Sequence, residues 1–146
     1  MLAQVGAKKL IGIGSNIEPR EGFIRTALKS MESYCQVLRT SAVYETAALL
    51  TDEASEDWNA PFLNLAAEIE FSGSAHEFLK RLKDTEAEIG RETKDKWAPR
   101  VIDLDILFWG QECIRTKDLA IPHPEIKNRS FVLTPLRDLV PSALAS

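Results

Sequence analysis

The sequence predicts an α+β domain in which two helices pack on one antiparallel sheet, with the βαββαβ element order of ferredoxin-like folds. Three observations support this prediction. Four segments have the apolar and β-branched content of strands, two segments between them repeat apolar residues at helical spacing, and the chain of 146 residues suits one core. We therefore expect residues 1–146 to form a single domain.

The first half of the chain predicts a strand, a helix and two more strands. Residues 8–15 form an apolar run that ends in glycine and serine, which predicts a buried strand leading into a turn. Apolar residues recur at helical spacing from Phe23 onward, and Pro19 suits the first turn of that helix. Residues 36–46 are rich in β-branched side chains and predict a second strand, and residues 62–71 predict a third.

The second half predicts a helix, a central strand and a C-terminal helix. Ser74 and Glu77 form a capping-box pattern, and the apolar stripe that follows them ends at Gly90. A charged loop then leads to residues 101–109, which have the apolar density of a central strand. Residues 131–139 predict the last helix.

The composition excludes several functional classes. The formal charge of -4 argues against a broad nucleic-acid surface, which is normally basic. No apolar run approaches the roughly 20 residues of a membrane span, and the N-terminus lacks a signal-peptide pattern, so we expect a cytoplasmic protein without membrane partners. Cys35 and Cys113 have no second cysteine or histidine at metal-site spacing, and we interpret them as packing residues.

Asp103 and Asp105 are the strongest candidates for chemistry. Strand alternation places both carboxylates on one face, roughly 7 Å apart. The apolar residues that we expect on the opposite face are Ile102, Leu104, Ile106 and Phe108. Two carboxylates so placed repel each other unless a cation lies beside them, and oxygen ligands favour a hard ion such as Mg²⁺. The alternative interpretation is the solvated face of an edge strand.

Cationic residues surround this pair along the chain and would suit a polyphosphate. They are Arg91, Lys94, Lys96 and Arg100 before the aspartates, and Lys127 and Arg129 after them. Phosphoryl transfer spreads charge over the phosphate oxygens, and positive groups stabilise that charge. His123 lies between two prolines that stiffen its backbone, and its imidazole could donate to a phosphate oxygen. A solvated charge run and a structural loop histidine are the alternatives.

Aromatic side chains could bind a planar heterocycle. Phe62, Phe131 and Trp97 could stack on such a ring, and Asn64 offers both a donor and an acceptor to its edge. Packing in the core is the alternative for each phenylalanine. The glycines of segment 12–16 match neither a dinucleotide nor a Walker pattern, so we interpret this segment as a tight strand-to-helix turn.

Six motifs resemble those of one family. They are IGIGSN, VYET, FLNLA, EIGR, WAPRVIDLDIL and IPHPEIKNRSFVL, and they run from Ile11 to about Pro141. In this order they are typical of the 6-hydroxymethyl-7,8-dihydropterin pyrophosphokinases of folate biosynthesis. The resemblance implies an α/β/α sandwich and a Mg²⁺-dependent 2-amino-4-hydroxy-6-hydroxymethyldihydropteridine diphosphokinase. Such a transferase moves pyrophosphate from ATP to the hydroxymethyl-dihydropterin and releases AMP.

The resemblance also implies roles for individual residues. Asp103 and Asp105 resemble the ligands of two Mg²⁺ ions, and Arg100 and His123 resemble catalytic residues at the triphosphate. The implied ATP-binding residues are Glu86, Arg91, Trp97, Arg100, Ile106, Ile121, His123, Lys127 and Arg129. The implied pterin-binding residues are Thr46, Leu49, Phe62, Asn64, Asp103 and Phe131, with the two phenylalanines enclosing the ring.

Three questions stay open at this stage. The hydroxyl proton could pass to Asp103, to Asp105 or to no protein base. A binding module with the same element order, such as an RNA-recognition domain, is a competing hypothesis, although residues 101–109 carry acids where that class has aromatic residues. The chain could also be fused to, or associated with, another folate-pathway enzyme. The chain also departs from the family's pattern at one position, since Ala98 stands where the family commonly has glycine.

Overall fold

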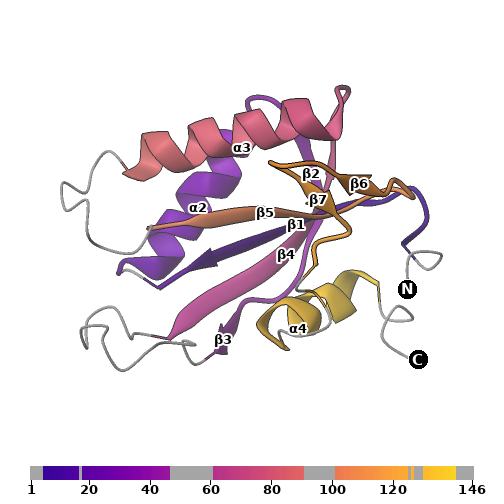
Figure 1. Cartoon of the computed structure of the whole chain (residues 1–146). Helices are drawn as coiled ribbons and strands as arrows, with labels where there is room; N and C mark the ends of the chain where they lie inside the picture. Colours follow the sequence, from indigo (N-terminus) through magenta and orange to yellow (C-terminus); the bar gives the residue numbers. More distant parts are fainter. Residues whose placement is uncertain are drawn as a thin grey trace.

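The computed structural model describes residues 5–16, 18–46, 61–90, 101–124, 126 and 130–140, without the side chains of residues 46, 130 and 131. The strands are β1 Lys9–Ser15, β2 Gln36–Thr40, β3 Tyr44–Thr46, β4 Phe62–Glu70, β5 Asp103–Trp109, β6 Ile114–Arg115 and β7 Ala120–Ile121. The helices are α2 Arg20–Met31, α3 Ala75–Gly90 and α4 Ser130–Leu139 (Figure 1).

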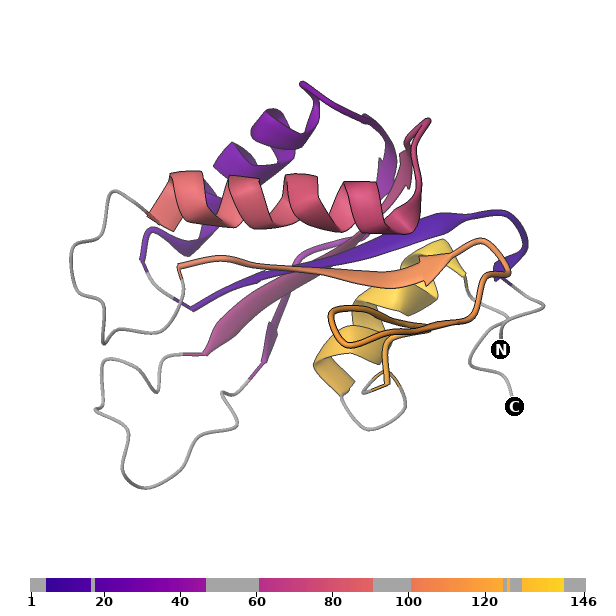
Figure 2. The same ribbon diagram turned by 45° about the horizontal axis from the view of Figure 1, so that its top comes forward.

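The main sheet is antiparallel, with β1 in its centre. Its order is β2-β4-β1-β5, and β3 also pairs with β4. Helices α2 and α3 cover one face, and α4 lies on the other, as Figures 1 and 2 show. β6 and β7 form a separate two-stranded sheet beside β5. This arrangement confirms the predicted α+β, ferredoxin-like fold and its α/β/α layers.

Each face of the sheet contributes to its own apolar core. The first core lies under α2 and α3, and its strand residues include Ile11, Ile13, Leu63, Leu65, Leu104 and Ile106. The second core lies against α4 and contains Val5, Leu10, Ala66, Leu107, Phe108, Ile126, Leu136, Leu139 and Val140. Because strand side chains alternate, one strand serves both cores.

Signals recognised in the sequence set the helix ends. The predicted capping box begins α3: Ser74 N–H donates to Glu77 Oε1 (3.2 Å), and Glu77 N–H donates to Ser74 Oγ (3.1 Å). Pro19 is the N-cap of α2, directly before Arg20. Helix α4 begins one residue earlier than predicted. None of the helices in the described ranges is long and apolar enough to cross a membrane.

The strand predicted over residues 36–46 is divided at Ser41. Ser41 N–H donates to Ala66 O (2.8 Å), and Ser41 Oγ accepts from Ala66 N–H (2.8 Å). The serine hydroxyl takes the place of a main-chain carbonyl, which interrupts the regular ladder. Two shorter strands, β2 and β3, therefore replace the single one that the composition predicted.

A bulge in β5 changes which residues face which core. Ile106 pairs with Ile11, but Phe108 pairs with the adjacent Leu10, so Leu107 is an extra residue. Leu107 and Phe108 therefore both face the second core. The prediction that Phe108 shares a face with the other apolar residues of this strand is wrong.

Gly12 and Gly14 lie inside β1. The strand continues to Ser15, so the predicted tight turn at segment 12–16 is wrong for its first four residues. The chain stays extended here because its side chains alternate: the isoleucines of β1 face the first core, and the glycines face the other side of the sheet.

Candidate active site

Two of the predicted site residues, Asn64 and Asp103, lie in one row across the sheet face on the side of α4. Tyr44 of β3 pairs with Asn64 of β4. Asn64 also pairs with Gly14 of β1, and Gly14 pairs with Asp103 of β5. Directly paired residues of antiparallel strands point to the same face. Four strands thus contribute one position each to a continuous line.

Gly14 makes room for the side chain of Asn64. A Cβ at position 14 would lie 2.6 Å from Asn64 Oδ1, far inside van der Waals contact. Asn64 is 8% exposed, and its amide lies over the backbone of Gly14. Since neighbouring strands are about 4.8 Å apart, Asn64 and Asp103 lie on strands roughly 10 Å apart. β1 places no side chain between them at this position.

Asp103 and Asp105 have the alternation that the sequence predicted. Asp103 is partly exposed and Asp105 is exposed, while Leu104 between them is fully buried in the first core. Two carboxylates on a rigid strand fit a hard divalent ion that takes its other oxygens from phosphates and water. In the described ranges, no three acidic, histidine or cysteine side chains gather in a metal-binding cluster. Two carboxylates leave coordination positions for other oxygens, which suits an ion shared with a substrate.

Glu86 of α3 is bonded to the backbone between the two aspartates. Glu86 Oε2 accepts from Leu104 N–H (2.8 Å), and Glu86 Oε1 lies 3.1 Å from Lys83 Nζ. The Glu86 side chain is only 8% exposed. Among the described strands β5 lies at the edge of the main sheet, so the prediction of a central strand is wrong, and its outward N–H groups need partners from outside the sheet. Glu86 thus supports the strand that carries the aspartates, and its contact with ATP stays a prediction.

The residues before β5 are attached to the end of β1. Ser15 Oγ donates to Val101 O (2.6 Å), and Ser15 is fully buried. This hydrogen bond fixes the approach of the chain to Asp103, two residues later. The hydrogen bond therefore holds the end of β1 next to the start of β5.

The β5 bulge also positions His123. His123 N–H donates to the carbonyl of Leu107, the extra residue, at 3.0 Å. The backbone of His123 therefore lies beside the strand of Asp105, two residues before the bulge. His123 is partly exposed. Its contact with a phosphate stays a prediction.

Two predicted ATP-binding residues have a packing role. Ile106 is 3% exposed and Ile121 is fully buried, and both belong to the first core. Their side chains already contact protein atoms in this arrangement. A contact of either with ATP stays a prediction.

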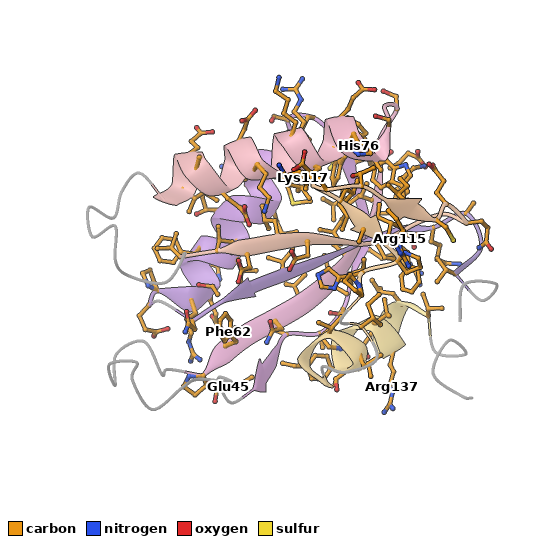
Figure 3. All side chains as sticks on the ribbon, in the orientation of Figure 1. Glu45, Phe62, His76, Arg115, Lys117 and Arg137 are labelled. Atoms are coloured by element: carbon orange, nitrogen blue, oxygen red, sulfur yellow. The ribbon has the colours of Figure 1, made fainter. Side chains whose placement is uncertain are left out.

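Other predicted residues are only partly described. Arg91, Trp97, Arg100, Lys127, Arg129 and Leu49 lie outside the described residues. Thr46 pairs with Phe62 at the end of β3, and Phe131 is the second residue of α4, but the side chains of Thr46 and Phe131 are outside the description. Phe62 is partly buried, and Figure 3 shows it near Glu45, where β4 begins.

Sequence reasoning missed the contributions of Gly14 and Tyr44. A glycine inside a strand often marks the close approach of another group, which is the signal that Gly14 offered. Tyr44 Oη donates to both oxygens of Asp138, at 2.9 and 2.8 Å, and this contact attaches α4 to β3. The two residues are 94 positions apart, and no local pattern in the sequence indicates such a contact.

Comparisons with known proteins match nearly the whole chain to one family. The family model described as 7,8-dihydro-6-hydroxymethylpterin-pyrophosphokinase (HPPK) matches residues 10–141. A 2-amino-4-hydroxy-6-hydroxymethyldihydropteridine pyrophosphokinase of Aquifex aeolicus is 35% identical over 134 residues, which are 92% of this chain and 81% of that protein. The Bacillus subtilis protein of the same name is 39% identical over 131 residues, or 88% of this chain and 75% of that protein.

Longer proteins are also similar. The mitochondrial folate synthesis bifunctional protein of Arabidopsis thaliana is 41% identical over 138 residues, which are 92% of this chain and 24% of that protein. A crystal structure of a Plasmodium falciparum HPPK-DHPS triple mutant with STZ-DHP has a TM-score of 0.70 at 16% sequence identity. That match covers 92% of this chain and 40% of that chain, and it supports the fold.

Proposed function

The chain belongs to the 7,8-dihydro-6-hydroxymethylpterin-pyrophosphokinase family and is a pyrophosphokinase of folate synthesis; from this premise we propose the donor, the ions and the residues that it uses. ATP donates its two outer phosphates as one unit. The acceptor is the hydroxyl of 6-hydroxymethyl-7,8-dihydropterin, and the products are AMP and the dihydropterin diphosphate.

One observation carries this proposal: the residues suited to a heterocycle and those suited to a metal and phosphates share one row. Asn64 and Asp103 are both paired with Gly14, on opposite sides of it. A ring bound at Asn64 would therefore extend its hydroxymethyl group toward the aspartates. A spacing of roughly 10 Å between the two strands suits a bicyclic ring with one added carbon and oxygen.

We assign the pterin to the end of the sheet where β4 begins. Phe62 supplies an aromatic face, and Asn64 supplies a donor and an acceptor to the amide edge of the ring. Phe131, at the start of α4, is the proposed partner of Phe62 on the opposite side of the ring. A pocket of this kind rejects analogues that lack the amide edge of the pterin, because each buried polar group left without its hydrogen bond costs about 1–3 kcal/mol.

Asp103 and Asp105 would hold two Mg²⁺ ions. Bound there, the ions would neutralise phosphate charge and lower the proton affinity of the pterin hydroxyl. Leu104 between the aspartates is buried and its N–H is bonded to Glu86. These contacts hold the two carboxylates in a fixed position relative to the sheet. Arg100, His123 and Arg129 are the proposed triphosphate contacts, with Arg91 and Lys127 beside them and Glu86, Trp97, Ile106 and Ile121 on the nucleoside side.

The transfer forms one bond and breaks one. The pterin hydroxyl oxygen attacks the β-phosphorus of ATP, and the bond from that phosphorus to the bridging α,β-oxygen breaks. AMP leaves with that oxygen and its bonding electron pair. The hydroxyl proton passes to Asp103, to Asp105 or to solvent. Positioning and charge stabilisation carry most of the rate enhancement in reactions of this type.

A product assay tests the proposal. The protein is mixed with ATP, Mg²⁺ and 6-hydroxymethyl-7,8-dihydropterin, and the nucleotides are separated. We expect AMP to form in step with a pterin diphosphate, and only when both substrates and the metal are present. ADP as the product would show transfer of a single phosphate and would contradict the proposal.

We also propose an association with a second folate-pathway enzyme. The observation that favours it is the bifunctional relatives, in which a similar segment is part of a longer folate synthesis protein. Affinity purification of the protein from its source cells, followed by mass spectrometry, tests this. Recovery of a folate-pathway enzyme on the same chain or as a partner would support it, and recovery of the pyrophosphokinase alone would not.

A further inference from the structure

We propose that Arg20 is a positioning residue for pterin binding that acts through Phe62, an inference that rests on the proposed function. Arg20 is the first residue of α2. Its Nη1 donates to Pro61 O (2.8 Å) and lies 2.8 Å from Glu45 Oε2. Pro61 directly precedes Phe62, and Glu45 directly precedes Thr46, which pairs with Phe62. Arg20 therefore contacts the two residues that directly precede Thr46 and Phe62 in the sequence.

This contact lies where the ladder between β1 and β4 ends. The last β1 residue in the ladder, Ser15, pairs with Leu63. Among the described strands, Phe62 is consequently paired on the β3 side alone. Terminal strand residues with few hydrogen bonds open most easily. Arg20 bonds the carbonyl of Pro61, the residue before Phe62, and so adds a hydrogen bond where the ladder between β1 and β4 has ended.

The guanidinium of Arg20 is itself fixed in orientation. Arg20 Nε donates to Glu18 Oε1 (2.8 Å), and its main-chain N–H donates to the same oxygen (3.2 Å). The Arg20 side chain is 20% exposed, whereas those of Glu18 and Glu45 are 75% and 54% exposed. Partial burial lowers the pKa of Arg20, but the hydrogen bonds to Glu18 and Glu45 raise it overall, so the group stays charged.

The shape of the side chain matters as well as its charge. A guanidinium presents several N–H donors in fixed directions, so one group can bond three segments at once. A lysine has a single flexible ammonium and cannot reproduce this geometry. The four contacts of Arg20 described above reach the beginnings of α2 and β4 and the end of β3, and none of these four involves β5. Its effect should therefore fall on the pterin and leave the nucleotide unaffected.

The experiment is a double-mutant cycle on pterin affinity. Binding of 6-hydroxymethyl-7,8-dihydropterin is measured by calorimetry in the presence of Mg²⁺ and an ATP analogue whose α,β-bridge cannot be cleaved. We expect Arg20→Ala to raise the pterin Kd by about threefold to tenfold, which lies within the range found for residues that share partners. The Kd of the ATP analogue should not change. In the Phe62→Ala background, Arg20→Ala should change the pterin Kd by less than about twofold.

Further variants keep the test decisive. Arg20→Lys should give a loss of pterin affinity between those of the parent protein and Arg20→Ala. If Arg20→Ala does not fold, Glu45→Gln replaces it, with an expected rise in the pterin Kd of about twofold. The matched control is Lys9→Ala, which removes a cation paired with Glu70 (3.3 Å) at the opposite end of β1 and should leave pterin binding unchanged. An equal loss with and without Phe62 would overturn the inference, as would an equal loss of ATP affinity. A wild-type protein that binds no pterin would overturn the proposed function and this inference with it.

Discussion

At the end of the main sheet that carries the two aspartates, the two faces are built from the same strands but have opposite character. Toward α2 and α3, the strands present buried aliphatic residues such as Ile13, Leu65 and Leu104. Toward α4, the same strands present Asn64, Gly14 and the two aspartates. At this end of the sheet, a step of one residue along β1, β4 or β5 moves from the first core to the candidate active site. The alternation of a strand thus separates stability from chemistry without requiring separate segments.

This comparison implies that neighbouring substitutions should have different consequences. A change at a residue of the candidate site on the α4 face, outside the second core, should alter activity and leave the free energy of unfolding nearly unchanged. A change on the face toward α2 and α3 should do the reverse. The predictions below test that separation, from the largest expected effect to the smallest.

The largest effect is expected at Asp105. Asp105→Asn keeps the size of the side chain and removes the charge, so kcat should fall about a thousandfold, which corresponds to about 4 kcal/mol of lost transition-state stabilisation. Because Asp105 is exposed, the free energy of unfolding should change by less than about 0.5 kcal/mol. Steady-state kinetics and urea unfolding measure both quantities.

The control for this variant is Asp118→Asn, which changes another exposed aspartate, close to the turn between β6 and β7. It should leave both kcat and stability unchanged. Near-normal turnover of Asp105→Asn would remove Asp105 from the proposed metal site.

The reverse effect is expected one residue earlier. Leu104 is fully buried, so Leu104→Ala should lower the free energy of unfolding by about 2–5 kcal/mol through lost burial and a residual cavity. The main-chain N–H that bonds Glu86 remains, so kcat of the folded fraction should fall far less than in Asp105→Asn. Urea denaturation and kinetics below the transition test this. A stable but inactive Leu104→Ala protein would break the separation of the two faces.

The next effect concerns Gly14, which lies between Asn64 and Asp103 in the row across the sheet. In Gly14→Ala the new Cβ would meet Asn64 Oδ1 at 2.6 Å and displace the amide, so the KM for the pterin should rise about tenfold or more. The KM for ATP should change little. Steady-state kinetics with each substrate varied in turn measures both constants.

Gly12→Ala is the matched control for that variant. Its Cβ would meet Leu107 Cδ2 at 3.4 Å, an ordinary contact with a flexible side chain. It should raise the KM for the pterin much less than Gly14→Ala does. If both alanine variants behave alike, the space at Gly14 is not what positions Asn64.

The smallest effect lies on the face toward α2 and α3 and depends on pH. Burial raises the pKa of Tyr34 to about 12, against an effect of the hydrogen bond to Thr85 (2.8 Å) that lowers it. The folded state therefore favours the neutral phenol. The stability that this provides is present below pH 10, the unfolded pKa, and is lost as the pH rises through about 12.

The measurement compares unfolding free energies at pH 8 and pH 11 by urea denaturation. Tyr34→Phe should lose less stability between these two pH values than the parent protein. Because burial also raises the pKa of Cys35 to about 11, both proteins should carry Cys35→Ala. Activity at pH 8 should be unchanged by Tyr34→Phe, and an equal pH response in both proteins would assign the alkaline loss to other groups.

The sequence predicted the fold well because its signals were local. The capping box at Ser74 and Glu77 and the period of two in β5 are patterns within a few residues. The break at Ser41 was not predictable, because it depends on Ala66, which is 25 residues away. The bulge at Leu107 depends in the same way on the register with β1.

The site shows the same division. Residue type and strand spacing make the aspartates and Asn64 candidates, and the structure brings Asn64 and Asp103 into one row. The part played by Gly14 was missed, because an absent side chain has meaning only when the neighbouring strand is known. The roles assigned to residues outside the described ranges stay predictions.

The bulge at Leu107 also limits how this protein can change in evolution. Substitutions in β5 alter one side chain, whereas deleting Leu107 would remove the bulge while every remaining residue kept its face and its partner in β1. The deletion would also remove a side chain of the second core and the carbonyl that accepts from His123 N–H, so His123 would lose its attachment to β5. We therefore expect relatives to tolerate varied residues between Asp105 and Trp109 but to keep their number constant.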